Sequence, residues 1–444
     1  MGSVEGGVTG SALLGRLAER WSPTRFGDLP PAVVEVARHC ALDWFGCALA
    51  GSREPLAVLL RDELDEGAAT VVGLDRTASP RTAALVNGAA GHALDFDDTH
   101  TLLSGHPTAP VLPAALGLGE ELDASGEDLL TAFVVGVEVE CRVGALLAPG
   151  HYRAGWHATG TVGTLGAAAA CARLLGLDGQ RTTHALALAA TQAAGLKASF
   201  GTMAKPLHAG KAATDGLLAA RLAGRGFTGN PGVLEAPQGL AAAAGGADPD
   251  PSRLDRLEDR WTILDTLFKH HAACYLTHAS INAALALGVA PDEVQQVDVH
   301  VARDSLQVCD ISEPATGLEG KFSLRATTAM ALLGDETTDM AAYSDARMAA
   351  PDLLAMRDRV RVVPEDERPG TRSRVVVTTT DGRTLEAEDD TGRPAADLAL
   401  QWERLSAKFR GLAAPVVGEE GADRLRQAVA EAARARTLGK LARP

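Results

Sequence analysis

The spacing of apolar residues is helical over most of the first 267 residues. From Ser11 to about Leu267, apolar positions recur mostly at intervals of three and four, the period of amphipathic helices. One such segment, 31–38, has Pro31 in its first turn, where proline is well tolerated. Another helix is expected at 182–194. This pattern predicts an all-helical domain.

Three glycines stand at every third position, 160, 163 and 166, before an Ala-rich run that ends at Leu175. A glycine costs a helix about 1 kcal/mol relative to alanine. Three of them on one helix face therefore predict that another helix, or a stretch of backbone, crosses closely there.

The period changes to two in the later part of the chain. Alternation over 297–301 and 373–379 predicts strands, and the Asp-Gly pair at 381–382 predicts a hairpin turn before a strand at 384–387. A helix is expected between these strands, over Leu324–Leu333. The middle section is thus predicted to be α+β.

After these strands the pattern is helical again, over 402–412 and 422–433. A helical tail that follows an α+β insert is expected to return to the first domain. We therefore predict a mainly α fold. Residues 1–267, completed by 397–444, would form a large helical domain, and 268–396 a smaller α+β lid domain.

Composition and charge narrow the classes of partner. Hydrophobic residues make up 46% of the chain and aromatic residues only 4%, so densely packed, Ala-rich helices are expected. The 42 basic and 57 acidic residues give a net charge of −15, which argues against a nucleic-acid or anionic-membrane partner. A small anionic substrate remains compatible, since local cations in a cleft outweigh a screened surface charge.

Cysteine usage and the apolar stretches favour a reduced, cytoplasmic protein. None of the six cysteines forms a C-x-x-C pair, so zinc ribbons and clustered iron–sulfur sites are not expected. The first residues lack the basic start of a signal peptide. The apolar stretch 129–148 contains Glu138, Glu140 and Arg142, which a membrane helix rarely tolerates.

Carboxylates, a hydroxyl and imidazoles gather in the twelve positions from 95 to 106. They are Asp95, Asp97, Asp98, Thr99, His100 and His106. Carboxylates and imidazoles are the side chains that move protons near neutral pH. The alternative interpretation is a helix end followed by a solvated acidic loop.

Two further clusters contain histidine and lysine. His157 opens the glycine-rich helix, where the positive end of the helix dipole favours its neutral form, although it could simply pack beside Trp156. Lys205 precedes a proline suited to the first helical position, so it is expected at a helix N-terminus, which binds carboxylate or phosphate. His208 and Lys211 share a face of that helix. The alternative is a basic helix start in solvent.

The fourth cluster runs from Lys269 to Cys274, with His278 beyond, at the junction of the two predicted domains. Clefts between domains are favoured ligand sites, although a surface loop is the simpler alternative.

Taken in order, these motifs resemble the MmgE/PrpD family, which contains 2-methylcitrate dehydratase, cis-aconitate decarboxylase and iminodisuccinate epimerase. The motifs are 95–99, 105–107, 155–157, 205–208 and Lys269 with Cys274, supported by 42–51 and 408–409. The resemblance spans nearly the whole chain. It implies a large helical domain, a smaller α+β lid, a homodimer, and an active site between the domains that uses no cofactor and no metal.

The resemblance also implies which residues form that site. The matching positions are Asp95, Thr99, His106, His157, Lys205 and Lys269. The chain departs from the family pattern where His271-Ala272 replaces an aromatic-Pro pair, and at two further positions. Cys274 stands where cis-aconitate decarboxylase carries a histidine, and Ala326 stands where the family carries a lid tyrosine, which would leave room for a substrate larger or less polar than citrate.

From these residues we expect a hydro-lyase that dehydrates a β-hydroxy carboxylate through an enolate-like intermediate. Lys205 and Lys269 would hold the carboxylate, His106 and His157 would serve as acid and base, and Asp95 would orient an imidazole. Further substrate-binding positions are expected at Thr99, His208, Lys211, Cys274 and Ala326.

Three other functions are compatible with the sequence. Within the family, an epimerase or a decarboxylase of a related di- or tricarboxylate solves the same chemical problem. Outside it, an Asp-rich helix end is also typical of Mg²⁺-dependent isoprenoid synthases, which need a second acidic motif and an aromatic cavity. A catalytically silent, ligand-binding relative is the third.

Overall fold

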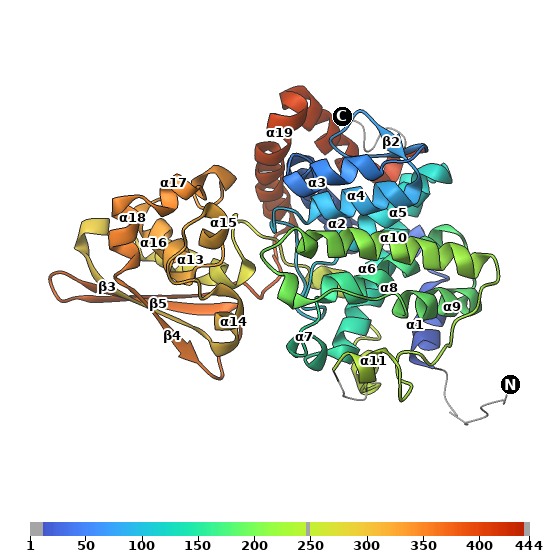
Figure 1. Cartoon of the computed structure of the whole chain (residues 1–444), viewed down its shortest axis with the longest axis horizontal. Coiled ribbons are helices and arrows are strands. Elements are labelled where there is room, and N and C mark those ends of the chain that lie inside the picture. The colour runs from blue at the N-terminus through green and yellow to red at the C-terminus, as the bar shows by residue number, and fades with distance from the viewer. Residues whose placement is uncertain (1–11, 246–248, 439–444) are drawn as a thin grey trace. The chain divides into compact units, whose positions relative to one another are not determined.

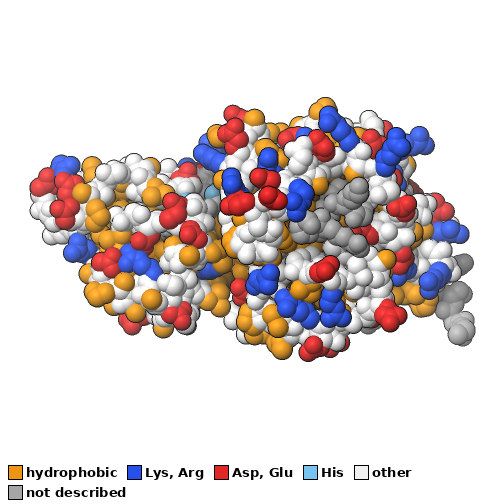
Figure 2. Space-filling model, turned by 90° about the horizontal axis from the view of Figure 1, so that it is seen from above, with side chains coloured by type: hydrophobic (Ala, Val, Ile, Leu, Met, Phe, Trp, Pro, Cys, Tyr) orange, Lys and Arg blue, Asp and Glu red, His pale blue; other side chains and the backbone are white. Residues whose placement is uncertain are grey.

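The computed structural model describes residues 12–245 and 249–438. By their contacts these residues divide into two compact units, drawn together in Figure 1 and Figure 2. The residues up to Thr266, with those from Asp397 onward, form the helical unit, and Leu267–Ala396 form the α+β unit. The predicted fold class, mainly α with a smaller α+β part, is confirmed.

Long helices make up most of the helical unit. They are α1 (Leu13–Trp21), α2 (Pro31–Gly51), α4 (Pro80–Gly91), α5 (Thr108–Glu121), α6 (Gly126–Leu147), α8 (Ala158–Leu174), α9 (Gly179–Ala190), α10 (Ala204–Gly224) and α19 (Leu398–Ala430). Shorter ones are α3 (Pro55–Leu60), α7 (Gly150–Arg153), α11 (Leu240–Ala243) and α12 (Ser252–Asp255).

The helical unit also contains two short paired strands, β1 (Ala69–Thr70) and β2 (Thr77–Ala78). The prediction that this unit is all-helical is therefore wrong at this hairpin. Helical side chains stabilise this hairpin. Thr70 donates through its backbone N–H and its hydroxyl to Glu120 at 2.6 Å each, and Asn87 Nδ2 donates to the Thr70 carbonyl at 2.8 Å.

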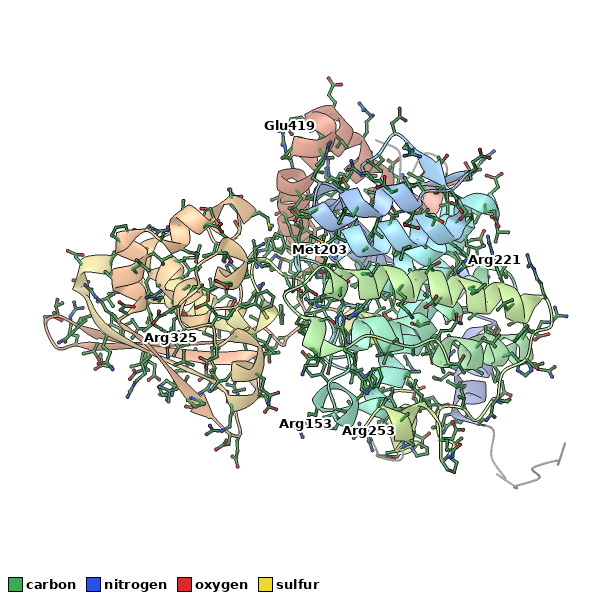
Figure 3. The ribbon with its side chains drawn as sticks, in the orientation of Figure 1. Arg153, Met203, Arg221, Arg253, Arg325 and Glu419 are labelled. Atoms are coloured by element: carbon green, nitrogen blue, oxygen red, sulfur yellow. The ribbon has the colours of Figure 1, made fainter. Side chains whose placement is uncertain are left out.

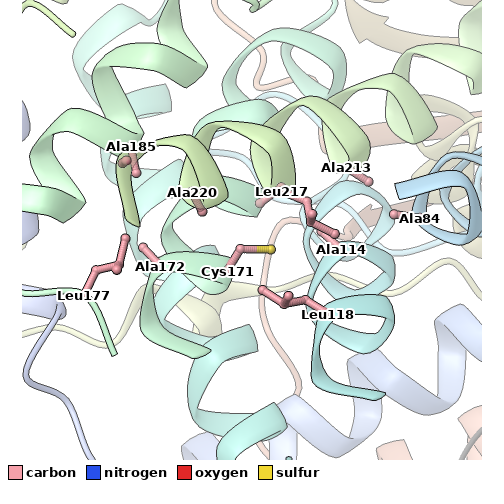
Figure 4. Packing of buried hydrophobic residues seen from close by; sticks show 12 residues of the cluster. Ala84, Ala114, Leu118, Cys171, Ala172, Leu177, Ala185, Ala213, Leu217 and Ala220 are labelled. Atoms are coloured by element: carbon pink, nitrogen blue, oxygen red, sulfur yellow. The ribbon is translucent and has the colours of Figure 1, made fainter. Parts of the chain in front are cut away.

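Small side chains allow the central helices to pack closely. Around Cys171 and Leu217, shown in Figure 4, alanines of several helices form one buried cluster. The three glycines of α8 lie where other helices cross it. A Cβ at Gly163 would lie 2.5 Å from Pro110 of α5, and one at Gly166 2.7 Å from Glu140 of α6. The close crossing predicted from their spacing is confirmed.

Charged side chains inside α6 bind neighbouring backbone. Buried Arg142 pairs with Glu138 one turn earlier, and also donates to the carbonyls of Leu257 at 2.8 Å and Arg260 at 2.7 Å. Glu138 in turn accepts the backbone N–H of Thr262 at 3.0 Å.

None of the helices within 12–245 and 249–438 combines the length and apolar run that a membrane crossing needs.

The α+β unit contains a four-stranded sheet in the order β4-β3-β5-β6. Its strands are β3 (Val294–Ala302), β4 (Val360–Glu365), β5 (Arg372–Thr379) and β6 (Thr384–Asp390). Strands β3 and β4 are parallel, and the other pairs are antiparallel. Gly382, with φ of 85°, closes the predicted hairpin between β5 and β6.

Helices cover one face of this sheet, and ion pairs cover the other. The helices of the unit are α13 (Tyr275–Leu287), α14 (Leu306–Cys309), α15 (Gly317–Gly320), α16 (Leu324–Leu333), α17 (Asp345–Met348) and α18 (Pro351–Arg357). Val297 and Val375 are fully buried, whereas Asp298 on the opposite face pairs with Arg361 at 2.8 Å.

Lysine 408 fixes the last long helix to the helical unit. The helix predicted at 402–412 and most of the one predicted at 422–433 lie in α19, which ends at Ala430 and bends at Gly418, where φ is 74°. The Lys408 ammonium donates to Asp43 Oδ1 and to the Phe96 carbonyl, each at 2.6 Å, and lies 3.9 Å from the Phe96 ring centroid. The Lys408 and Asp43 side chains are 7% and 1% exposed.

Replacing this lysine should therefore destabilise the fold. Lys408→Met leaves the buried Asp43 carboxylate without its ammonium, which costs about 3–5 kcal/mol of unfolding free energy. Urea denaturation measures it. The matched control is Arg410→Met on the same helix, whose ion pair with Glu419 is exposed and should leave the midpoint unchanged. Equal midpoints for the two variants would contradict this role of Lys408.

Candidate active site

Three segments far apart in the sequence meet within the helical unit. They are the turn after α4, which carries Asp95 and Asp97, the start of α8 at His157, and the first turn of α10 at Lys205. Met203, labelled in Figure 3, is the N-cap of α10. The helix begins at Ala204, two residues before the proline that was predicted to be its first residue.

Lys205 and Asp95 form an ion pair in this cluster. The Lys205 ammonium is 2.5 Å from Asp95 Oδ1, and the two side chains are 11% and 13% exposed. Asp95 has a left-handed backbone, with φ of 52°, a conformation that costs energy in residues other than glycine and often marks functional sites. Because an ammonium has three N–H donors, Lys205 can bind a further carboxylate while it remains paired.

His106 lies between two carboxylates. Its Nε2 is 3.7 Å from Asp95 Oδ1, and its Nδ1 is 3.3 Å from Asp97 Oδ2. Asp97 also accepts from Nδ1 of His92, which lies 3.0 and 2.9 Å from its two oxygens. His92 was not predicted from the sequence, and Asp97 was recognised only as one member of the 95–106 cluster, without a role of its own. Their spacing of five, across a helix end, was the available signal.

His157 and His208 share a hydrogen bond, with Nδ1 to Nδ1 at 3.1 Å. Burial, reinforced by His92 and Lys205, lowers the pKa of His157 well below its usual value. Burial and Lys211 also lower the pKa of His208. Both rings are therefore neutral at neutral pH, and only one proton lies between them. The donor ring then has a bare Nε2, whereas the acceptor ring carries its proton on Nε2.

The imidazoles form one continuous cluster. The His92 ring centroid is 4.5 Å from that of His106 and 5.6 Å from that of His157, with which it stacks. Phe200 packs edge-on against His157, at 5.0 Å between centroids, and its ring lies 5.3 Å from the Lys205 ammonium. Of these rings, His92 and His157 are buried, at 1% and 2% exposure.

Asp97 and Asp98 are adjacent in sequence but differ in charge. Burial alone would raise the pKa of Asp97, but His106 and His92 lower it well below its usual range, so it is ionised. Burial and the Asp43 charge raise the pKa of Asp98 to about 8, and this carboxyl accepts from Thr108 instead. Both side chains are buried, so the alternative of a solvated acidic loop is wrong.

Other predicted residues of the helical unit support the site or lie beside it. Thr99 donates from its hydroxyl to the Gly105 carbonyl at 3.1 Å, which closes the loop that carries His106. His100 binds the Thr262 carbonyl at 2.8 Å, a structural contact. Lys211 donates to the Gln192 carbonyl and to Asp215, so its ammonium is already bound outside the cluster.

The remaining predicted residues belong to the α+β unit. Lys269 is 1% exposed, Cys274 caps α13 and is 8% exposed, and Ala326 on α16 is fully buried. Burial also lowers the pKa of His278 well below its usual value, with His271 and Lys269 contributing. That Lys269, Cys274 and Ala326 contribute to the same active site stays a prediction.

The four side chains around His106 also have the composition of a metal site. His92, Asp95, Asp97 and His106 each offer a ligand atom, and these atoms lie within 4.8 Å of one another. However, the Lys205 ammonium lies against Asp95 at 2.5 Å and supplies a positive charge there. We therefore interpret the four as proton-handling groups.

Comparison with known proteins agrees with the motifs. A model of the MmgE/PrpD N-terminal domain matches residues 15–252, and one of the MmgE/PrpD C-terminal domain matches residues 271–434. The chain belongs to the MmgE/PrpD family. The resemblance inferred from the sequence is thus confirmed, and the isoprenoid synthase alternative gains no support.

Curated relatives from animals and fungi match most of the chain. Cis-aconitate decarboxylase of Mus musculus is 32% identical over 362 residues, covering 76% of this chain and 72% of the mouse protein. The Homo sapiens enzyme is 30% identical, covering 88% and 86%, and the Aspergillus terreus enzyme is 28% identical, covering 88% and 87%. These names describe the relatives.

The charge states of the cluster can be tested without a substrate. Burial, opposed by Asp97, lowers the pKa of His92 to about 4. In a pH titration followed by histidine NMR, His92 should protonate near pH 4 and His157 well below 6.5. A midpoint near 6.5 for either ring would show that the cluster is solvated.

Proposed function

We propose that the protein is a lyase that removes water from a β-hydroxy carboxylate and uses no cofactor. The reaction begins with removal of the proton next to the carboxylate, gives an enolate-like intermediate, and ends with loss of the hydroxyl group. It needs a proton acceptor, a proton donor, and positive charge or N–H groups at the carboxylate.

The His157–His208 hydrogen bond is the observation that carries this proposal. Because the two neutral rings share one proton, their outer nitrogens are of opposite kinds: one accepts and the other donates. Dehydration needs both at once, an acceptor for the α-proton and a donor for the departing hydroxyl group. His208 therefore joins His157 in proton transfer, beyond the substrate-binding role expected from the sequence.

Lys205 and His106 support the intermediate. The N–H groups that Lys205 has left after pairing with Asp95 would hold the substrate carboxylate and stabilise the enolate charge. His106 lies beside this ion pair and has a carboxylate near each ring nitrogen. A proton on either nitrogen therefore has a negative charge close to it. Asp95 positions both groups, and Thr99 holds their loop.

Sequence alone supports the proposed contributions of the α+β unit. Lys269 is the second cation for the carboxylate, and Cys274 and Ala326 define the shape of the substrate. A homodimer and a cytoplasmic location are parts of the proposal that also rest on the sequence, and on the family resemblance.

A decarboxylase of a related tricarboxylate is the second candidate. The relatives named cis-aconitate decarboxylase favour it. Decarboxylation also gives a carbanion next to a carboxylate, but it needs only the donor nitrogen of the imidazole pair. The same cluster therefore suits either reaction, and the products distinguish them.

One experiment tests both candidates. The purified protein is incubated in D₂O with citrate, 2-methylcitrate, malate and cis-aconitate, and followed by proton NMR. We expect the resonances of a hydroxy acid to give way to those of an alkene, a vinylic proton from citrate or malate or an allylic methyl group from 2-methylcitrate, without carbon dioxide. Carbon dioxide release from cis-aconitate would establish the decarboxylase instead. No change in any substrate, and no deuterium at an α-carbon, would contradict both.

Loss of an imidazole should slow turnover without unfolding the protein. We expect His157→Ala, His208→Ala and His106→Ala each to lower kcat/KM by about 10²–10⁴-fold. His184→Ala is the matched control, because this histidine of α9 binds the Gly229 carbonyl, outside the cluster, and its loss should leave kcat/KM unchanged. Wild-type turnover in a cluster variant would remove that residue from the mechanism.

The fall of kcat/KM on the acid side of its pH profile should be shifted to low pH. The base works in its neutral form, and the lowered pKa of His157 keeps it neutral below 6.5. As pH falls, kcat/KM should therefore stay constant through 6.5 and decline only well below it. A decline centred at or above 6.5 would show that His157 is not the base.

A further inference from the structure

Asp97 is a charged group to which the proposed mechanism assigns no step beyond its place beside His106. It is ionised and fully buried, and its contacts among the described residues are with two imidazoles. Its oxygens lie 3.0 and 2.9 Å from Nδ1 of His92, and one lies 3.3 Å from Nδ1 of His106. A buried carboxylate is costly unless it is paired, so this arrangement calls for an explanation.

His92 adds a second unusual feature. Since Nδ1 faces an ionised carboxylate and the ring is neutral, its proton lies on Nδ1 and its Nε2 is bare. That Nε2 is buried and has no hydrogen-bond partner within the described parts of the chain. An unsatisfied buried acceptor costs about 1–3 kcal/mol, so stability alone does not explain this residue.

The place of the His92 ring suggests its use. It packs against both His106 and His157, with 4.5 and 5.6 Å between centroids, so its orientation limits theirs. Asp97 in turn fixes His92 and faces Nδ1 of His106. That last contact is short but not aligned as a hydrogen bond, a geometry that can improve when substrate binds.

We propose that Asp97 and His92 are positioning residues for the proton-transfer cluster. Asp97 holds both neighbouring imidazoles with Nδ1 toward itself, which directs Nε2 of His106 toward the Asp95–Lys205 pair. His92 transmits this constraint to His157 through ring packing. The inference rests on the proposed function, because it assigns these residues to the same site.

The neighbouring aspartate provides a matched control. Asp97→Asn removes the negative charge that favours a proton on both Nδ1 atoms, and in either orientation its amide group lies beside an Nδ1 atom as a competing donor. The ring facing that amide is then expected to move its proton to Nε2. Asp98→Asn alters a buried carboxyl that is already neutral and binds Thr108, so charge and contacts are kept.

We expect Asp97→Asn to lower kcat by about 10²–10⁴-fold with KM unchanged, and Asp98→Asn to leave both within about threefold. A wild-type kcat in Asp97→Asn, or an equal loss in Asp98→Asn, would overturn the proposal. Should Asp97→Asn fail to fold, His92→Gln replaces it, with a lowered kcat expected and a wild-type kcat overturning the proposal.

A measurement without substrate separates this inference from the proposed function. Long-range ¹H–¹⁵N NMR reports which ring nitrogen carries the proton. In the unsubstituted protein, His92 and His106 should both be protonated on Nδ1, and in Asp97→Asn one of them should change to Nε2. Unchanged rings would overturn the positioning role even in an active dehydratase. The expected change would support that role even if none of the tested acids is turned over.

Discussion

The close approach of α8 to its neighbours is the constraint on which the site depends. At Gly160 this packing reaches the chemistry directly, because a Cβ there would lie 2.8 Å from Cβ of His208. A larger residue would push His208 away from His157 and break their 3.1 Å contact. The glycines that cost helix stability therefore bring two imidazoles together, and His157, the one that begins α8, is buried.

Exclusion of water then sets the charges. Burial keeps His92 and His157 neutral at neutral pH, so they can accept protons. Asp97 remains ionised because two imidazoles surround it, whereas its neighbour Asp98 faces Asp43 and holds its proton near neutral pH. One short turn thus presents a charged and a neutral carboxyl on opposite sides, and only the charged one belongs to the imidazole cluster.

Much of this arrangement could be predicted from the sequence, and the remainder depended on tertiary contacts. Helix periodicity and the Asp-Gly turn located most elements, but β4 was missed because its parallel pairing and its Pro364 give no clear alternation. His106, His157 and Lys205 were selected by residue type. His92 was missed because a histidine at the end of an Ala-rich helix resembles a core residue, and Asp97 could not be distinguished from Asp98 before the turn at Asp95 was known.

Proton positions are the most direct test of this account. A neutron structure at neutral pH shows deuterium on individual ring nitrogens. We predict one deuteron between Nδ1 of His157 and Nδ1 of His208, one on Nδ1 of His92, and none on Asp97. Deuterons on both nitrogens of His157 and His208, or on the Asp97 carboxyl group, would contradict the claim that buried neutral imidazoles handle the protons.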